Sequence, residues 1–237
     1  MDYSYVDDNL AEIRKNIEGA LKIRKNIVGG GNVEILAVTK TVDTDRINYA
    51  ASKGIKLIGE NRTNELLEKY DKLNKENLEI HFIGRLQTNK VKYIIDKVSL
   101  IHSVDSLRLA EEINRQAAKK NLSANILIEV NIGGEASKGG INKGGVNEFC
   151  ENLSKMDNIK IKGLMVLPPV CVEKGENNKY FKEIYDILVD NRTKKRDNID
   201  MQIISAGMSG DYADAIVFGA NIIRLGAAIF GRRAGHI

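Results

Sequence analysis

Eight short runs of apolar, mostly β-branched residues recur along the chain, and this recurrence constrains its fold more than any other feature. Stretches within them, such as 126–128 and most of 161–167, are continuously apolar rather than alternating, as expected for strands that are buried on both faces. Amphipathic stretches with helical spacing separate most of the runs. We therefore predict strands at 33–39, 55–58, 78–83, 98–104, 125–132, 159–167, 201–206 and 221–225. The predicted helices between them span 44–53, 62–73, 87–97, 105–120, 144–156, 176–192 and 211–219.

Alternating strands and helices leave two main architectures, a closed (β/α)8 barrel and a doubly wound open sheet. The even spacing favours the barrel, as does the lack of a GxGxxG or Walker sequence after any strand. We predict a single α/β domain over residues 1–237, a (β/α)8 TIM barrel with an extra N-terminal helix within 1–30. Apolar residues at helical spacing over 5–28 predict that helix, and the glycines 29–31 are expected to end it. The length of 237 residues is close to the roughly 250 of a typical barrel of this kind.

The cysteine and histidine residues exclude several kinds of site. Cys150 and Cys171 form no CxxC pair, so neither a disulfide framework nor a cysteine zinc site is expected. His81, His102 and His236 are too scattered in the sequence for a typical histidine metal motif. Two unpaired cysteines are also typical of a reducing compartment.

Charge and hydropathy give no sign of a nucleic-acid or membrane protein. The formal net charge is only +4, and the densest basic segment, 192–196, is flanked by aspartates and is better explained as a charged helix end. The acidic N-terminus lacks the features of a signal peptide, and no apolar run approaches the roughly 20 residues needed to span a bilayer. We expect a cytoplasmic protein that binds neither nucleic acid nor membranes.

Two basic residues follow or lie within strands at positions where a barrel carries its chemistry. Lys40 has the same parity as Leu36 and Val38, which is compatible with an amine in the barrel mouth that acts as a nucleophile. A lysine that ends a strand in solvent is the commoner explanation of this pattern. Arg224 lies in an apolar strand and needs an acceptor or an anion, and a ligand and a salt bridge to Glu129 explain it equally well.

The glycine-containing segments 205–210 and 226–228 follow the last two strands, where barrels usually bind a phosphate. With Lys40 and Arg224 at the same mouth, they describe a site for a phosphorylated aldehyde or a sugar phosphate.

Three further polar residues have simpler explanations. Glu60 and Asp105 follow strands, and although either is a candidate acid or base, both are expected to cap the next helix. His81 lies within an apolar run and is expected to be a hydrogen-bonded core residue. The longest loops, 133–143 and 168–176, are expected on the active face.

Taken in chain order, the strand-end motifs resemble the YggS/PROSC family of pyridoxal phosphate homeostasis proteins. They run through nearly the whole chain, and the HFIGRLQTNK sequence is the most specific of them. The motifs are AVTK at 37–40, GEN at 59–61, HFIGRLQTNK at 81–90, EASKGG at 135–140, GLM at 163–165, GMS at 207–209 and RLGAAIFG at 224–231.

The resemblance implies a barrel of the fold-type III, alanine racemase-like class, with pyridoxal 5'-phosphate held as an aldimine on Lys40. It also implies that Asn61 lies near the ring, that Arg224 faces the pyridine nitrogen, and that the last two loops hold the phosphate. The implied cofactor-binding residues are Lys40, Asn61, Ser205, Gly207, Met208, Ser209, Arg224, Gly226 and Ala227.

Two positions depart from the family pattern. The family often has Met where Ala206 stands, and Thr or Ser where Ala227 stands. The missing hydroxyl at Ala227 leaves only a backbone donor there, so a lower phosphate affinity is expected, without loss of the site.

The resemblance, with the length of the chain, favours a cofactor carrier over an enzyme. A charged arginine at the pyridine nitrogen leaves that nitrogen unprotonated and weakens the cofactor as an electron sink. The chain ends at Ile237, soon after Gly226, so no second domain is expected to close the site. The alternatives are a pyridoxal phosphate-dependent racemase or decarboxylase, and a Schiff-base aldolase that acts on a sugar phosphate through Lys40.

We therefore expect a monomer that binds pyridoxal phosphate and maintains its intracellular supply, with apo-enzymes as possible recipients and no robust catalysis of its own. Lys138, in the first long loop, is expected to be an exposed lysine, and a second cofactor acceptor is the alternative.

Overall fold

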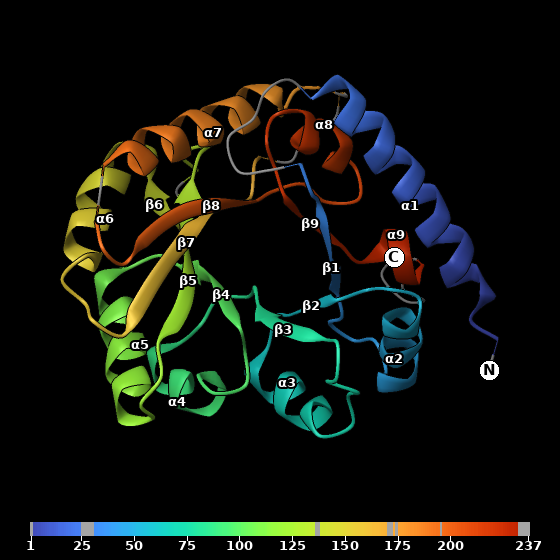
Figure 1. Cartoon of the computed structure of the whole chain (residues 1–237), viewed down its shortest axis with the longest axis horizontal. Helices are drawn as coiled ribbons and strands as arrows, with labels where there is room; N and C mark the ends of the chain where they lie inside the picture. Colours follow the sequence, from blue (N-terminus) through green and yellow to red (C-terminus); the bar gives the residue numbers. More distant parts are fainter. Residues whose placement is uncertain are drawn as a thin grey trace.

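A closed barrel of parallel strands forms the centre of the computed structural model, which describes residues 2–24, 31–135, 138–169, 173, 175–194 and 196–231 (Figure 1). The hydrogen-bonded order is β4-β3-β2-β1-β9-β8-β7-β5, and pairing of β4 with β5 closes the ring. A short strand, β6, extends the sheet beside the end of β5. The strands are β1 (Glu34–Val38), β2 (Leu57–Glu60), β3 (Glu79–Phe82), β4 (Leu100–Val104), β5 (Ala124–Asn131), β6 (Ile141–Asn142), β7 (Ile159–Val166), β8 (Ile199–Ser205) and β9 (Ile222–Leu225).

The helices surround this ring on its outer side, as Figure 1 shows. Apolar residues at helical spacing give each long helix one buried face, which covers the sheet. The α-helices are α1 (Ser4–Ile23), α2 (Thr44–Ser52), α3 (Thr63–Tyr70), α4 (Val91–Ile94), α5 (Leu107–Lys119), α6 (Val146–Leu153), α7 (Asn178–Thr193), α8 (Tyr212–Val217) and α9 (Ala227–Phe230). Two 3₁₀ turns, η1 (Thr88–Lys90) and η2 (Lys143–Gly145), precede α4 and α6.

The predicted barrel and its strands are confirmed, with three corrections. The first helix ends at Ile23 rather than at residue 28, and residues 25–30, with two of the three glycines expected to end it, lie outside the described residues. The stretch 87–97 is a 3₁₀ turn followed by a four-residue helix, not one continuous helix. The two-residue strand β6 was not predicted, because its pattern is too short to distinguish from a loop.

The barrel has two separate apolar cores. The larger one lies between the outer face of the sheet and the helices. The smaller one, which we call the inner cluster, consists of alternate strand residues that point inside the ring, because successive side chains of a strand face opposite sides. The buried members of the inner cluster are Leu36, Leu57, Leu100, Leu127, Met165 and Ile222.

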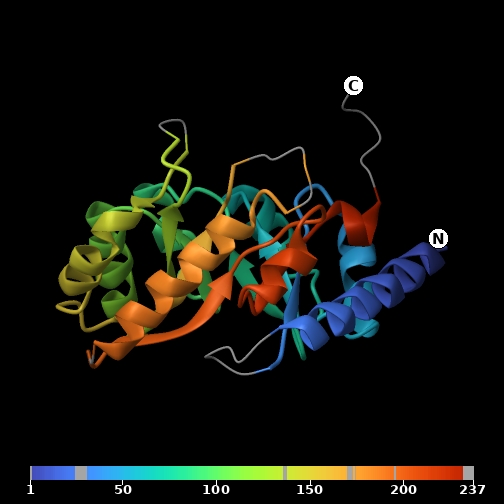
Figure 2. The same ribbon diagram turned by 90° about the horizontal axis from the view of Figure 1, so that it is seen from above.

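The additional N-terminal helix α1 packs against α8 and α9, as Figure 2 also shows. Two of its side chains form hydrogen bonds to these elements. Asn9 donates a hydrogen bond from Nδ2 to the carbonyl of Ile229 (2.9 Å), and Asn16 donates to the hydroxyl of Tyr212 (3.0 Å). The helix thus supports the two short elements that follow the last strands.

The basic segment 192–196 lies at the end of α7, as predicted. Lys194 donates to Asp190 (2.7 Å), and Arg196 donates to a side chain of α6 (2.9 Å). Lys195 lies outside the described residues. Over the ranges that the structure describes, no helix has both the length and the apolar character needed to cross a membrane.

Candidate functional site

The strand register brings the predicted basic residue Lys40 to the carboxyl-terminal mouth of the barrel. Val38 of β1 pairs with Gly59 of β2, so Lys40 lies beside the start of the loop that contains Asn61. On the other side, β1 pairs with β9, and a Cβ added at Gly226 would lie 3.5 Å from Val38. The side chain of Lys40 is half-buried. Residues that are far apart in the sequence therefore meet at one end of the barrel.

The turn that carries Lys40 is held from both sides. Lys69 of α3 donates from Nζ to the carbonyl oxygen of Thr39 (2.8 Å). The backbone N–H of Thr41 donates to Oε1 of Glu65, and this same oxygen accepts from Lys69 (2.6 Å). Thr41 has a left-handed φ of 63°, a strained conformation for a β-branched residue. These contacts hold that conformation and fix where the Lys40 side chain begins.

Glu60 completes this support from inside the protein. Its side chain is fully buried, and its Oε1 accepts from the Thr39 hydroxyl (2.7 Å) and from Lys69 (2.9 Å). Burial raises the pKa of Glu60 even though both hydrogen bonds act in the opposite direction. The expectation that Glu60 caps the next helix is wrong: α3 has Arg62 at its N-cap position. The carboxylate instead pairs with Lys69 beneath the Lys40 turn.

Asp105 is also not a helix cap. Ser106 occupies the N-cap position of α5, and Asp105 instead approaches Glu129 at the mouth. Burial and the charge of Asp105 raise the pKa of Glu129, and Arg224 and Arg85 partly oppose this rise. The two carboxylates therefore form an acidic side of the mouth.

Arg224 points into the barrel and has neutral acceptors there. Its Nη1 donates to the hydroxyl of Ser205 (2.7 Å), and its Nη2 donates to the carbonyl of Val166 (2.8 Å). Among the described residues, Glu129 is not within ion-pair distance, so the direct salt bridge left open by the sequence is not formed. Burial lowers the pKa of Arg224 to about 10, which still leaves the guanidinium charged at neutral pH.

Ser205 has its hydroxyl inside the barrel, and its expected role toward a phosphate stays a prediction. Its hydroxyl is fully buried in the barrel, where it accepts from Arg224 and lies 3.0 Å from Nδ1 of His102. The sequence signal for this position was only its place before a glycine loop, which does not reveal on which side of the sheet the hydroxyl lies. We therefore assign Ser205 to the support of Arg224.

The loop after β8 has an ordered shape that leaves part of its backbone free. Gly207 has a φ of 89°, and a Cβ there would lie 2.8 Å from the Cα of Tyr212, so this position requires glycine. The N–H of Met208 donates to Oδ1 of Asp211 (2.7 Å), and is therefore already occupied. The assignment of Met208 to the cofactor site stays a prediction, and the backbone N–H groups of the next two residues are free within the described part of the chain.

Four backbone N–H groups at this end of the site have no acceptor among the described residues. They line one cavity of about 540 Å³ between the loop after β8, the start of α9 and the helix α1. Adjacent free N–H groups of this kind are typical of anion-binding loops. The four donors belong to Ser209, Gly210, Ala227 and Ala228.

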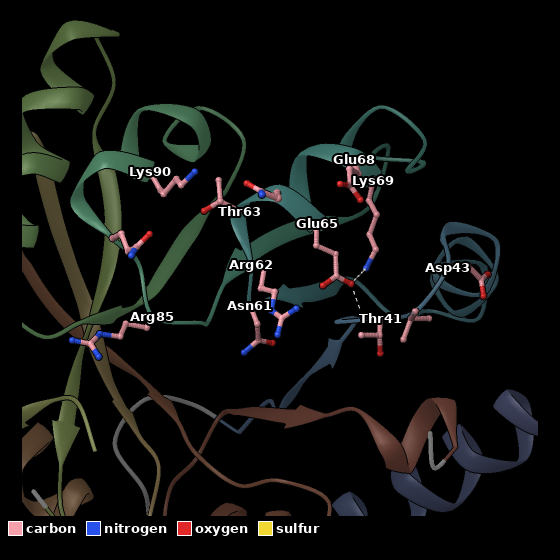
Figure 3. Close-up of a pocket in the computed structure, with 13 residues that line it drawn as sticks. Thr41, Asp43, Asn61, Arg62, Thr63, Glu65, Glu68, Lys69, Arg85 and Lys90 are labelled. Atoms are coloured by element: carbon pink, nitrogen blue, oxygen red, sulfur yellow. Dashed lines mark hydrogen bonds and ion pairs between the residues drawn. The ribbon is translucent and has the colours of Figure 1, made fainter. Parts of the chain in front are cut away.

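A second cavity of about 770 Å³ lies beside the Lys40 turn, between the loops that follow β1, β2 and β3. Figure 3 shows Asn61 and Arg62 next to each other within it, with Arg85 on one side and the Lys69–Glu65 pair on the other. The Oδ1 atom of Asn61 is buried and has no hydrogen-bond partner in the described part of the chain. An unpaired buried acceptor favours a ligand that donates to it.

Lys138 is not the freely exposed loop lysine that was expected. Its Nζ donates to the carbonyl of Pro168 (2.9 Å) and lies 3.3 Å from Oε1 of Glu135. It thereby connects the loop after β5 to the loop after β7. Ala136 and Ser137, which belong to the same family motif, lie outside the described residues.

Sequence reasoning found His81 but missed its partner. His81 is buried and hydrogen-bonded, as predicted, with its Nδ1 3.0 Å from Nε2 of His102. His102 and Lys69 were not singled out, because a histidine in an apolar run and a lysine on an amphipathic helix are both ordinary. The only sequence pattern that pointed to His102 is its alternation with Leu100, which indicates that both side chains face the inside of the barrel.

Comparison with known proteins gives a consistent result. The model of the alanine racemase N-terminal domain family matches residues 9–234. The pyridoxal phosphate homeostasis protein of Aquifex aeolicus is 41% identical over 205 residues, which cover 86% of this chain and 89% of that protein. The protein of the same name from Pseudomonas aeruginosa is 31% identical over 234 residues, 97% of this chain and 96% of that one.

A solved structure agrees with these relatives. PipY of Synechococcus elongatus, solved with pyridoxal phosphate bound, superposes with a TM-score of 0.80 at 26% identity, and the match covers 95% of this chain and 100% of that chain. The expected alanine racemase-like barrel is thus confirmed.

Proposed function

Because this chain belongs to the pyridoxal phosphate homeostasis proteins and carries the alanine racemase N-terminal domain, we propose that it binds pyridoxal phosphate at the barrel mouth and holds it for delivery to other proteins. The observation that carries the proposal is the meeting of Lys40, Arg224 and a cradle of free backbone N–H groups at one mouth.

The residues at the mouth fit this cofactor. When bound, pyridoxal phosphate supplies an aldehyde that a lysine amine attacks with loss of one water, a phosphate dianion, and an aromatic ring. The four free N–H groups suit the phosphate, and the departure at Ala227 matters little because its backbone N–H is the donor. The unpaired Oδ1 of Asn61 is available to the ring's hydroxyl side. The sequence-based assignments of Gly207, Ser209 and Gly226 remain part of the proposal.

Lys40 is the covalent attachment point in this proposal. Its half-buried position just after β1 supports this role, as do the contacts of Lys69 with Thr39 and Glu65, which hold the turn. Positioning of this kind increases the rate of bond formation by holding the reacting groups together.

Arg224 favours storage of the cofactor over turnover. The guanidinium stays charged at neutral pH, and a charged group at the pyridine nitrogen keeps that nitrogen unprotonated. This weakens the electron withdrawal on which racemases and decarboxylases depend. We therefore propose a carrier that maintains the supply of pyridoxal phosphate for apo-enzymes.

We also propose that the carrier is a cytoplasmic monomer. The barrel closes within one chain through β4 and β5, so no partner is needed to complete the sheet. A cytoplasmic location is supported by the free thiol of Cys150, which is buried and unpaired; Cys171 lies outside the described residues.

The test of covalent binding compares the purified protein with its Lys40→Ala and Lys138→Ala variants after incubation with pyridoxal phosphate. We expect visible absorbance in the parent and in Lys138→Ala, and its loss in Lys40→Ala. Borohydride should bleach the colour and add the reduced cofactor mass to the peptide that contains Lys40. Parent protein that stays colourless and takes up no cofactor would contradict the proposal. Mass on Lys138 as well would identify a second acceptor.

Two further measurements test the alternative activities. Incubation of the loaded protein with single amino-acid enantiomers should leave their optical activity unchanged and release no carbon dioxide, whereas turnover would favour the racemase or decarboxylase. Borohydride trapping of a sugar phosphate on Lys40 in colourless protein would favour the aldolase. A transfer assay, in which an apo-enzyme regains activity from the loaded carrier faster than from free cofactor at equal concentration, tests delivery.

A further inference from the structure

Polar side chains cross the inside of the barrel, and the proposed binding site uses only one end of them. His81 of β3, His102 of β4, Ser205 of β8 and Arg224 of β9 are each at most 5% exposed. They lie among the apolar residues of the inner cluster. Burial of polar groups is costly unless they are hydrogen-bonded. Apolar residues would fill the same space at lower cost, so a role for these polar side chains other than packing is expected.

The contacts form one continuous path. Arg224 Nη1 lies 2.7 Å from Ser205 Oγ, which lies 3.0 Å from His102 Nδ1. His102 Nε2 lies 3.0 Å from His81 Nδ1. His81 Nε2 is 3.7 Å from Oε2 of Glu79, longer than a hydrogen bond, so this last step is an electrostatic contact. We call this path, from Arg224 to Glu79, the barrel relay.

The two ends of the barrel relay fix the direction of its hydrogens. Arginine only donates, so Ser205 accepts from Arg224, but its second lone pair and its hydrogen leave the bond to His102 open in either direction. The Glu79 end decides the order, because a carboxylate only accepts, so the hydrogen of His81 lies on Nε2, which faces Glu79. Nδ1 of His81 then accepts from Nε2–H of His102, and Nδ1 of His102 accepts from the hydroxyl of Ser205. The opposite order would set two acceptors, His81 and Glu79, against each other.

The surroundings of His102 keep its ring neutral, as this order requires. Burial lowers its pKa well below the usual range, and the neighbouring His81 and Arg224 lower it further. The ring therefore has one donor and one acceptor over the physiological range, and it uses both.

The two ends of the relay lie in different electrostatic surroundings. At the lower end, Glu79, Lys162 of β7 and Asp200 of β8 line a cavity of about 300 Å³ with His81. At the upper end, the charges that act on Arg224 are those of Glu129 and Asp211. The relay thus joins the opposite mouth of the barrel to the cofactor side.

We propose that His102 and His81 are positioning residues, which act through Ser205 to hold the Arg224 guanidinium in the orientation that faces the ring nitrogen of bound pyridoxal phosphate. This inference rests on the proposed function, because Arg224 matters only if the cofactor is bound above it. The relay keeps a lone pair of Ser205 directed at Arg224, since the serine hydrogen is committed to His102. Without the imidazole, the hydroxyl is free to turn and the guanidinium loses its fixed acceptor.

The proton order is tested first in the protein without cofactor, by nitrogen-15 NMR of its histidine rings. We expect His102 to be the neutral Nε2–H tautomer and to stay neutral below the pH at which free imidazole titrates. An Nδ1–H tautomer, or protonation of His102 near the pH at which free imidazole titrates, would overturn the relay. This measurement does not depend on cofactor binding.

The positioning role is tested in the loaded protein with His102→Leu and a matched His102→Gln variant. The two polar atoms of glutamine can accept from Ser205 and donate to His81, whereas leucine does neither. For His102→Leu we expect release of pyridoxal phosphate to become about tenfold faster, the scale of one lost hydrogen bond to a charged group. The pH at which the cofactor absorbance changes should also shift by about one unit.

His102→Gln should stay within about twofold of the parent in release and keep its pH profile. If His102→Leu folds but keeps the parent's pH profile and release rate, the positioning role is refuted. If it does not fold, Ser205→Ala supplies the same comparison with both histidines intact. Parent protein that binds no cofactor would instead refute the proposed function, while the NMR result would stand.

Discussion

Replacing Lys69 with methionine tests whether the buried pair beneath the Lys40 turn stabilises the protein. The pair is well defined: the Lys69 Nζ lies 2.9 Å from the Glu60 carboxylate, and their side chains are 11% and 0% exposed. Methionine keeps most of the volume of lysine but removes its charge and its bonds to Glu60, Glu65 and Thr39. Glu60 is then left as a buried carboxylate without a cation.

Removing one partner of a buried pair costs about 3–5 kcal/mol of unfolding free energy. The cavity beside the turn gives water access to Lys69, so we expect the lower end of this range, about 3 kcal/mol. For a chain of this size that corresponds to a fall in Tm of about 6–12 °C. Lys182→Met is the matched control: its pair with Asp186 is exposed, so the expected loss is under about 0.5 kcal/mol.

The pH dependence supplies a second readout with a defined sign. Burial raises the pKa of Glu60 in the folded protein, and loss of Lys69 should raise it further. A carboxyl whose pKa is higher in the folded state than in the unfolded state takes up protons on folding, so stability falls as pH rises through that window. The deficit of Lys69→Met should therefore be largest near neutral pH and shrink as pH falls through the raised pKa of Glu60.

Urea unfolding of the parent, Lys69→Met and the double variant Glu60→Gln/Lys69→Met measures these effects. In the double variant the fully buried carboxylate of Glu60 is gone, so we expect it to recover more than half of the loss. A Lys69→Met protein that loses less than about 1 kcal/mol, or a double variant that is no more stable than the single one, would refute the reasoning.

Three further outcomes follow from the site and its supports. Gly207→Ala should lower the unfolding free energy by about 1–3 kcal/mol, because its φ is 89° and its new Cβ would meet Tyr212 at 2.8 Å; urea titration measures this, and an unchanged midpoint would contradict it. Asn9→Ala removes the hydrogen bond to Ile229 and should lower the unfolding free energy by about 1 kcal/mol. It should also weaken the binding of inorganic phosphate measured by calorimetry, and an unchanged affinity would show that α1 does not support the free N–H groups. Burial raises the pKa of Cys150 to about 11, so its thiol should resist a disulfide reagent at neutral pH until the protein unfolds, in contrast to rapid labelling of an exposed thiol.

The barrel was predictable from the sequence because its strands are buried on both faces. β5 contains the apolar run 126–128 and β7 ends in the apolar run 164–166, so these strands stand out without any knowledge of their partners. The limits of the elements were less predictable. Helix α1 ends five residues early, at Ile23 rather than at residue 28, although the charged and apolar pattern continues beyond that point.

The site was only partly predictable, because side-chain partners depend on distant strands. Lys40 and Arg224 could be placed at the mouth from their positions at strand ends. The contacts of Ser205 with Arg224 and His102, by contrast, join β8 to β9 and β4. The sequence around Ser205 does not predict them, because the partners lie on other strands. Asp105 was assigned to a cap because an acid before a helix usually is one, and tertiary proximity to Glu129 overrode that preference.

The separation of the inner cluster from the outer core bears on how such a barrel can change over evolutionary time. Most of its buried apolar residues lie outside the ring, between sheet and helices, while six occupy the inside. Substitutions at the mouth or along the inner wall therefore disturb a small part of the buried surface, and the folding free energy depends mainly on the rest. The chain can acquire a different ligand preference through a few inward-facing positions while the scaffold that presents them stays the same.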